Sequence, residues 1–237
     1  MQRFFIFYIV CVLAFMGIAT GKVSSSVCLD EEMYPPLFSD NFEDGDAGEW
    51  KPHFPDNWGV RKEEGSFVYK LIAPGEPGRI RAPYSWSILA EFDVSGFVFQ
   101  GRLRCNEDID NPYRDVVILF NFQDPEHFYY VHFSAISDEV HNIIGLVNGR
   151  DRVKVNLEPP GESKAILNDD RFHDFKVTYA REKGEICAYL DDLDIPILSA
   201  VDKTLKHGAV GLGSFDDIAD FDEIRLWGNI YRDRPDQ

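Results

Sequence analysis

Residues 114–135, RDVVILFNFQDPEHFYYVHFSA, decide the fold of this chain. The stretch predicts two β-strands joined by a polar turn at Gln123-Asp124-Pro125-Glu126, because β-branched and aromatic residues flank that turn. In antiparallel register one face is apolar and should be core; it carries Val116, Ile118, Phe120, Tyr129, Val131 and Phe133. The opposite face should present a phenol and an imidazole on a flat platform. It carries Asp115, Val117, Leu119, Asn121, Phe128, Tyr130, His132 and Ser134.

The rest of the chain continues as short strands between turn signals. Residues 96–104, GFVFQGRLR, alternate in character, so one face should carry Phe97, Phe99 and Leu103 and the other Gln100, Arg102 and Arg104. Further strands are expected within residues 38–50, 58–60, 65–69, 79–89, 140–147, 152–156, 172–180, 185–190, 209–215 and 221–227. Apart from one possible helical turn at 202–205, this pattern predicts an all-β jelly-roll sandwich of two antiparallel sheets.

The N-terminus has the features of a secretory signal peptide over residues 1–21. Arg3 supplies the positive charge, an apolar run of 16 residues follows, and small residues offer two cleavage sites. Because that run is short for a membrane span, an uncleaved anchor is the weaker alternative. We therefore expect a secreted or periplasmic protein without membrane contact after cleavage. The remainder divides into an N-terminal segment 22–37, a single domain 38–228 and a tail 229–237.

Three cysteines remain after the signal peptide: Cys28, Cys105 and Cys187. An odd number leaves at least one thiol free or paired with another chain. Cys105 is expected at the end of a strand and Cys187 within one, so a bridge between these two is one open possibility.

The chain is strongly acidic, with a formal net charge of −17. Such a charge is unfavourable for binding nucleic acid or an anionic membrane surface. One interpretation is that the charge keeps the protein soluble. The alternative is that some of the carboxylates hold Ca²⁺, which is bound by hard oxygen ligands.

Several segments carry a family resemblance that covers residues 38–228. The matching segments are FSDNFEDGDAGEW (38–50), RAPYSWSIL (81–89), RDVVILFNFQDPEHFYYVHFS (114–134), VHNIIGLVNG (140–149), FHDF (172–175), LDDLDIPIL (190–198) and GAVGLGSFDDIADFDEIRLWG (208–228). The chain thereby resembles concanavalin A-like lectin/glucanase jelly rolls, including laminin-G-like and family 16 glycoside-hydrolase-like domains, and most closely a set of secreted bacterial jelly-roll proteins. Phe172 and Leu190 stand where that set usually has a Trp and an aromatic residue.

The resemblance implies a structural calcium ion that joins the first strands to the last. The positions that match its ligands are Asp40, the carbonyl group of Gly65, and Asp222. Carboxylate and carbonyl oxygens are ligands that Ca²⁺ prefers. The alternative is that both aspartates are ordinary turn residues, as is expected of the adjacent pair Asp216-Asp217.

The acidic motif of a family 16 hydrolase is not found in this sequence. Such a retaining enzyme needs two carboxylates about 5 Å apart on one strand face. The nearest cluster, Glu107-Asp108-Ile109-Asp110, falls in an expected loop.

A basic and aromatic set forms the remaining candidate site. Gln100, Arg102, Tyr130 and His132 are expected to share a face outside the core, with Arg81, Arg114 and His141 near its rim. Arginine forks bind carboxylates, and Tyr or His can transfer protons, so this set would suit a polysaccharide lyase that acts on uronates. The alternative is that the arginines pair with surface acids and His132 is a satisfied strand histidine.

The expected function is binding or processing of an extracellular carbohydrate. One alternative is an enzyme, either a polysaccharide lyase or a glycoside hydrolase, and another is a non-catalytic structural or adhesion module. Convergence of Arg102, Tyr130 and His132 in one cleft would favour the enzyme.

Overall fold

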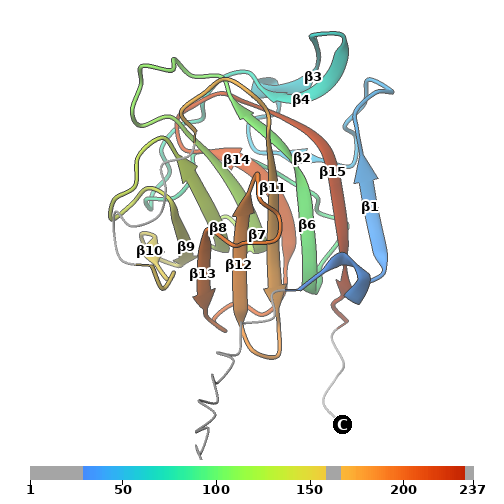
Figure 1. The fold of residues 1–237 in the computed structure, drawn as a ribbon, viewed down its shortest axis with the longest axis vertical. Coiled ribbons are helices and arrows are strands. Elements are labelled where there is room, and N and C mark those ends of the chain that lie inside the picture. Colours follow the sequence, from blue (N-terminus) through green and yellow to red (C-terminus); the bar gives the residue numbers. More distant parts are fainter. Residues whose placement is uncertain (1–28, 159–166, 233–237) are drawn as a thin grey trace, which may run out of the picture.

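The computed structural model describes residues 29–158 and 167–232, which form two antiparallel β-sheets packed face to face (Figure 1). The first, sheet A, has the order β13 (Leu198–Val201), β12 (Glu185–Leu190), β11 (His173–Ala180), β6 (Val94–Cys105), β15 (Ala219–Ile230), β4 (Ser66–Leu71) and β3 (Trp58–Glu63), with β1 (Pro36–Asp40) paired to β15. The second, sheet B, has the order β10 (Val153–Lys154), β9 (Ile143–Asn148), β8 (His127–Ser134), β7 (Asp115–Asp124), β14 (Ala209–Ser214), β5 (Ser85–Ile88) and β2 (Lys51–Pro52). Two short 3₁₀ turns, η1 (Glu31–Met33) and η2 (Pro55–Asn57), precede β1 and β3.

The hairpin predicted from residues 114–135 is β7–β8, and its register is the expected one. Val116 pairs with Phe133, Ile118 with Val131, and Phe120 with Tyr129. The turn is shorter than expected, because the strands continue to Asp124 and resume at His127. An irregularity between Phe120 and Asp124, with Asn121 at a φ of 46°, accommodates the shorter turn.

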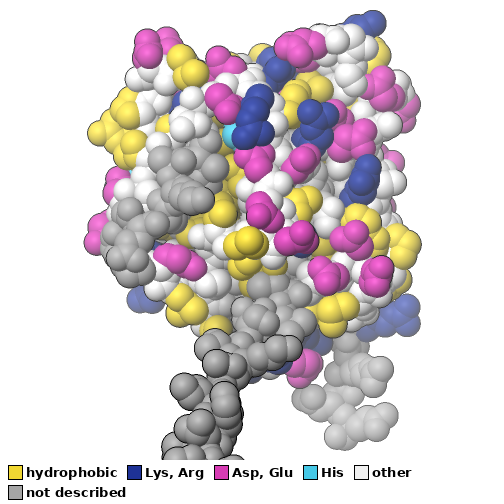
Figure 2. Space-filling model, in the orientation of Figure 1, with side chains coloured by type: hydrophobic (Ala, Val, Ile, Leu, Met, Phe, Trp, Pro, Cys, Tyr) yellow, Lys and Arg dark blue, Asp and Glu magenta, His cyan; other side chains and the backbone are white. Residues whose placement is uncertain are grey.

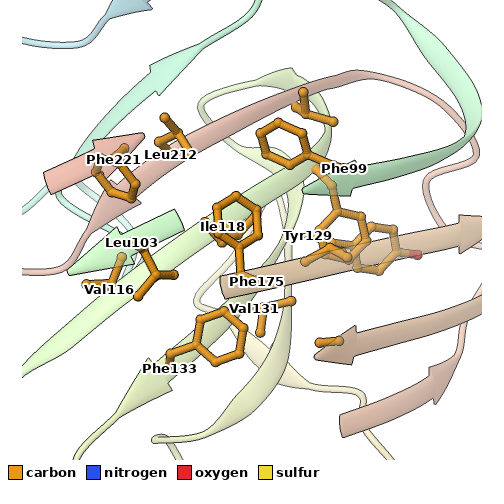
Figure 3. Packing of buried hydrophobic residues seen from close by; sticks show 14 of the residues in the cluster. Phe99, Leu103, Val116, Ile118, Tyr129, Val131, Phe133, Phe175, Leu212 and Phe221 are labelled. Atoms are coloured by element: carbon orange, nitrogen blue, oxygen red, sulfur yellow. The ribbon is translucent and has the colours of Figure 1, made fainter. Parts of the chain in front are cut away.

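The core lies between the two inner faces. Figure 3 shows Ile118, Val131 and Phe133 of β7–β8 facing Phe99, Leu103 and Phe175 of sheet A. All six side chains have no exposed surface. Burying each large apolar side chain contributes about 1.5–3 kcal/mol, so this layer supplies most of the driving force for folding.

The outer face of sheet B carries a second, smaller apolar cluster. Its buried members are Ala82, Ile88, Val117, Leu119, Phe128, Tyr130, Val147, Ala209 and Phe215. Gly145 makes room for the Tyr130 ring, because a Cβ atom at Gly145 would lie 2.3 Å from that ring. Tyr130 and His132 do point away from the core, but their exposed fractions are 0% and 1%. The expected flat, accessible platform is therefore wrong, because loop residues cover this face.

The outer face of sheet A is polar. The alternation of residues 96–104 is confirmed, with Phe97, Phe99 and Leu103 in the core and Gln100, Arg102 and Arg104 outside it. Figure 2 views this face and shows acidic and basic side chains interspersed over it. The accessible polar surface that was predicted for the hairpin is thus found on the outer face of sheet A.

The expectations for the cysteines and for the helical turn can also be compared with the structure. Cys187 is disulfide-bonded whereas Cys105 is a free, buried thiol, so no bridge joins these two. Residues 202–205 form no helical turn, and β13 just before them was not expected. The predicted signal peptide, residues 1–21, lies outside the described residues. Within the described ranges no helix is long and apolar enough to cross a membrane.

Candidate binding trough on the outer face of sheet A

Strand register arranges the polar side chains of sheet A in rows. One row crosses the sheet as Arg225 of β15, Gln100 of β6 and Lys176 of β11. The next row runs Asp222, Arg102 and Asp174 on the same strands. Because neighbouring strands lie about 4.8 Å apart, the members of a row are side-chain neighbours.

Arg102 occupies the centre of the second row and is shared between two acids. Its guanidinium nitrogens lie 3.9 Å from an Asp174 oxygen and 3.9 Å from an Asp222 oxygen, and 42% of its side chain is exposed. The guanidinium also lies over the Phe172 ring at 4.7 Å, and that of Arg104 lies over the same ring at 4.6 Å. Phe172 therefore provides an aromatic support that orients both arginines.

Three adjoining hollows lie along these rows, with volumes of about 390, 250 and 370 Å³. Glu223 and Arg225 line both the first and the second hollow. Gln100 and Leu193 line both the second and the third. We call this line of adjoining hollows the trough; it runs from the end of β1 across β15, β6 and β11 to the loop after β12. Its charged and amide side chains are Asp30, Glu31, Glu32, Asp40, Asn41, Asp44, Gln100, Arg102, Asp174, Lys176, Asp194, Glu223 and Arg225.

Lys176 is the most enclosed charged group of the trough. Only 5% of it is exposed, and its ammonium lies 4.2 Å from the centre of the Tyr189 ring. Its side chain makes no ion pair with any of the described residues. Beside it, Gln100 Nε2 donates a 2.9 Å hydrogen bond to Glu31 Oε2 of the η1 turn. The trough therefore contains fixed donors that a ligand could use.

The backbone is strained where the first two hollows meet. Glu223 has a φ of 51° and sits in a register shift between Asp222 and Arg225 of β15. A non-glycine residue in this conformation costs of order 1–3 kcal/mol and is more common at functional sites. The bulge turns Glu223 and Arg225, which form a 2.8 Å ion pair, toward the trough.

The residues proposed from sequence separate into two groups. Gln100 and Arg102 line the trough, whereas Tyr130 and His132 lie on the outer face of sheet B, so the expected shared face is wrong. The separation arises because β6 and β8 belong to different sheets whose inner faces meet. His141 does join His132, at 5.2 Å between ring centres, and the positive charge of Arg81 acts on the Tyr130 hydroxyl.

A buried polar cluster surrounds His132 and was not foreseen. His132 Nδ1 donates to the Val140 carbonyl at 2.8 Å, and Nε2 lies 3.3 Å from Asp115 Oδ2. Asp217 Oδ2 accepts the Asp115 backbone N–H at 2.5 Å. Burial and the nearby Asp115 charge raise the pKa of Asp217 to about 7. The sequence signal was the adjacent acids Asp216-Asp217, which resembled an ordinary turn.

One hollow of about 120 Å³ lies on the outer side of sheet B. Its wall includes Trp86 stacked against His53, with ring centres 4.6 Å apart. Phe54, which contacts His53, has a φ of 59°. This smaller hollow is one alternative location for a ligand.

The expected calcium ligands do not form a site in this arrangement. The Asp40 carboxylate accepts hydrogen bonds from Phe42 N–H at 2.8 Å and Trp50 Nε1–H at 3.4 Å, and Asp222 Oδ1 accepts one from Glu223 N–H at 2.7 Å. Burial raises the pKa of both carboxyl groups. Within residues 29–158 and 167–232, no three His, Cys, Asp or Glu side chains are grouped to hold a metal. The structure therefore shows no grouped carboxylate site at these positions, and the calcium ion stays a prediction.

Comparison with solved structures identifies the fold as the concanavalin A-like jelly roll. A carbohydrate-binding module, CBM66, from Bacillus subtilis aligns with a TM-score of 0.55 and 14% identity over 76% of this chain and 96% of its own. Cellulose induced protein, Cip1, aligns at 0.56 and 15% identity over 80% and 96%. The metal-free lectin I-B4 from Griffonia simplicifolia aligns at 0.52 and 10% identity over 82% and 100%. No family model and no curated protein sequence matches the chain.

Proposed function

We propose that this protein is a secreted carbohydrate-binding protein that holds an extended glycan chain in the trough of sheet A. The observation that carries the proposal is that three adjoining hollows lie in line across four neighbouring strands. Three inter-strand steps from β1 to β11 span about 14 Å, which is longer than a single monosaccharide. A polymer that lies across the strands would contact every row in turn.

The chemistry of the trough suits sugar hydroxyl groups. Arginine and carboxylate side chains form directed, charge-assisted hydrogen bonds, and here Arg102 is oriented by Phe172, Asp174 and Asp222. Such groups, held by strands of a packed sheet, lose little freedom when a ligand binds. The carbohydrate-binding module and the lectin with similar folds support the proposal by analogy.

The enzymatic alternative receives less support from the geometry. The lyase set inferred from sequence required Arg102 to meet Tyr130 and His132, which instead lie on the outer faces of opposite sheets. Both aromatic side chains are enclosed. A binding role through Arg102 needs no such convergence.

The test is a glycan array followed by calorimetric titration of the strongest ligand. We expect Arg102→Ala to weaken binding at least tenfold, because the central donor of the trough is lost. The matched control is Arg61→Ala on β3, whose exposed guanidinium donates only to the Val60 carbonyl among the described residues. Equal losses in both variants, with unchanged melting temperatures, would reject the trough as the site.

Calcium has a separate test. On the observed geometry we expect the same melting curve with and without a chelator. A lower melting temperature on chelation that Asp222→Ala abolishes would instead demonstrate the ion inferred from the sequence, since a ligand bound only to the folded state stabilises it.

A further inference from the structure

We propose that a disulfide between Cys28 and Cys187 fixes residues 29–34 as a strap across the outer face of sheet A. This inference goes beyond the proposed function, because it concerns how the chain holds its own N-terminal segment. It follows from the bonded state of Cys187 and from the path of the described residues that come directly after Cys28.

The cysteines of the chain leave few partners for Cys187. The sequence contains four cysteines, and Cys187 is disulfide-bonded. Cys105, the other cysteine within the described ranges, is a free thiol. Burial raises the pKa of the Cys105 thiol to about 11, so it offers little thiolate for disulfide exchange. The partner is therefore Cys11 or Cys28, and the predicted cleavage of residues 1–21 would remove Cys11.

Cys187 lies on a part of the outer face of sheet A that another segment covers. Its neighbours along β12, Ile186 and Ala188, point into the core, so Cys187 points outward. Nevertheless, Cys187 is only 3% exposed, and Tyr189, the next outward residue of β12, is 1% exposed. Side chains on an outer face are buried to this extent only where another part of the chain lies over them.

Residues 29 and 30 reach β12 on either side of Cys187. Leu29 is buried and lines a hollow of about 510 Å³ together with Glu185. Burial, and then the charge of Asp30, raises the pKa of the Tyr189 hydroxyl to about 12. Glu185, Cys187 and Tyr189 project from the same side of β12, with successive members about 6.8 Å apart. Cys187 therefore lies between the two positions that the strap reaches.

Covalent geometry brings Cys28 within reach of Cys187. Adjacent Cα atoms are about 3.8 Å apart, so the position of Leu29 restricts that of Cys28. A disulfide joins residues whose Cα atoms lie about 4.4–6.8 Å apart. Forming the bond removes two electrons and two protons from the two thiols, and the disulfide of an oxidant protein accepts them by thiol–disulfide exchange. The path of the strap thus favours Cys28 over Cys11.

The strap needs this anchor because its described noncovalent contacts are few. The η1 turn is three residues long and has no side-chain cap. Glu31 Oε2 accepts the 2.9 Å hydrogen bond from Gln100 Nε2. The Tyr34 hydroxyl lies close to Gly96, where a Cβ atom would be 3.0 Å from it. A short terminal segment of this kind is poorly ordered unless it is tied down.

The bond also affects the trough, a consequence that rests on the proposed function. Asp30, Glu31 and Glu32 line the third hollow together with Gln100 and Lys176. Cys28→Ser should therefore weaken binding of the strongest glycan from the array severalfold. Equal affinity in the wild type and this variant would overturn the role of the strap in the trough and leave the proposed function standing. Binding of no glycan by the wild type would reject the proposed function and leave the disulfide to the tests below.

Variants test what the bond holds in place. Cys28→Ser and Cys187→Ser should each lower the melting temperature by several degrees, because the chain between the two residues is no longer closed into a loop. The double variant should match the single variants, since both remove the same bond. Amide hydrogen exchange at residues 29–34 should rise by about tenfold or more in Cys28→Ser, whereas β7–β8 should keep its protection. Additive losses of stability, or unchanged exchange at residues 29–34, would contradict the strap.

Peptide mapping of the wild-type protein tests the bond itself and depends on no variant that must fold. The full chain is exported to an oxidising compartment, alkylated in denaturant and digested with trypsin without reduction. We expect one cross-linked species that joins residues 23–61, which contain Cys28, to residues 184–203, which contain Cys187. This species should separate on reduction and should persist in the control variant Cys105→Ala.

Two results of the mapping would overturn the inference. One is a link from residues 184–203 to residues 4–22, which contain Cys11. The other is alkylation of Cys28 or Cys187 in the unfolded protein before any reduction. Alkylation of Cys105 alone under these conditions, and of all the cysteines after reduction, is the result that the proposed bond predicts.

Discussion

Asp217 shows how a single residue that looks ordinary in the sequence becomes unusual in the fold. Its carboxyl group is enclosed beside Asp115, where Asp217 Oδ2 accepts the Asp115 N–H and the Asp217 N–H donates to Ser214 Oγ. Burial, and then repulsion from Asp115, raises its pKa from 3.8 to about 7. Adjacent aspartates in a turn gave no sign of this, because burial comes from strands that are distant in sequence.

The raised pKa predicts a pH dependence of stability. The folded state holds the Asp217 proton more tightly than the unfolded state, so the stabilisation is complete below pH 3.8 and is lost as the pH rises through about 7. The free energy of unfolding should decline by at most about 1.4 kcal/mol per pH unit in that window on account of this group. Urea denaturation at several pH values measures the slope.

Asp217→Asn should flatten that slope, because an amide oxygen can still accept the Asp115 N–H but does not titrate. The control is Asp56→Asn, an exposed residue of η2. Two parallel profiles for the wild type and Asp217→Asn would show that the decline comes from other groups, such as Asp216, Asp40 and Asp222, whose pKa values burial also raises.

At the scale of the element, the β7–β8 hairpin was predictable because its strands alternate in character and pair locally. Ile118 lies in the core with no exposed surface, opposite Val131. Ile118→Ala should lower the free energy of unfolding by about 2–5 kcal/mol, since a large apolar side chain is replaced by a cavity. Equilibrium urea unfolding tests this.

Ile195→Ala provides the comparison for that prediction, because Ile195 is 66% exposed. The urea midpoint of the Ile195→Ala variant should stay near that of the wild type. If Ile118→Ala unfolds at the wild-type midpoint as well, the strand does not occupy the core position described.

Other elements depend on partners that a local pattern cannot reveal. β13 is four residues long and is defined by its pairing with β12. The length of the turn at Pro125-Glu126 was overestimated from the sequence. The irregularity at Asn121 shortens this turn without changing the pairing of Phe120 with Tyr129. Periodicity identifies the faces of a strand, but bulges and edge strands follow from the whole sheet.

At the scale of the whole molecule, the sequence assigned the candidate strand residues to the correct side of their strands but joined two different outer faces into one site. Gln100, Arg102, Tyr130 and His132 all point away from the core, as expected. However, a sandwich has two outer faces, and alternation does not tell them apart. The loops bury Tyr130 and leave Arg102 accessible, and their positions depend on the order of the strands in each sheet. The trough could not be predicted from the sequence because it depends on the alignment of β1, β15, β6 and β11.

The central claim is that ligand binds on sheet A, and amide chemical-shift mapping tests it most directly. The protein is titrated with the strongest glycan from the array, and shifts are followed residue by residue. We predict the largest changes at 100–102, 174–176 and 223–225, which line the trough. Changes concentrated instead around Trp86 and His53, or around His132 and His141, would place the site on sheet B and contradict the account.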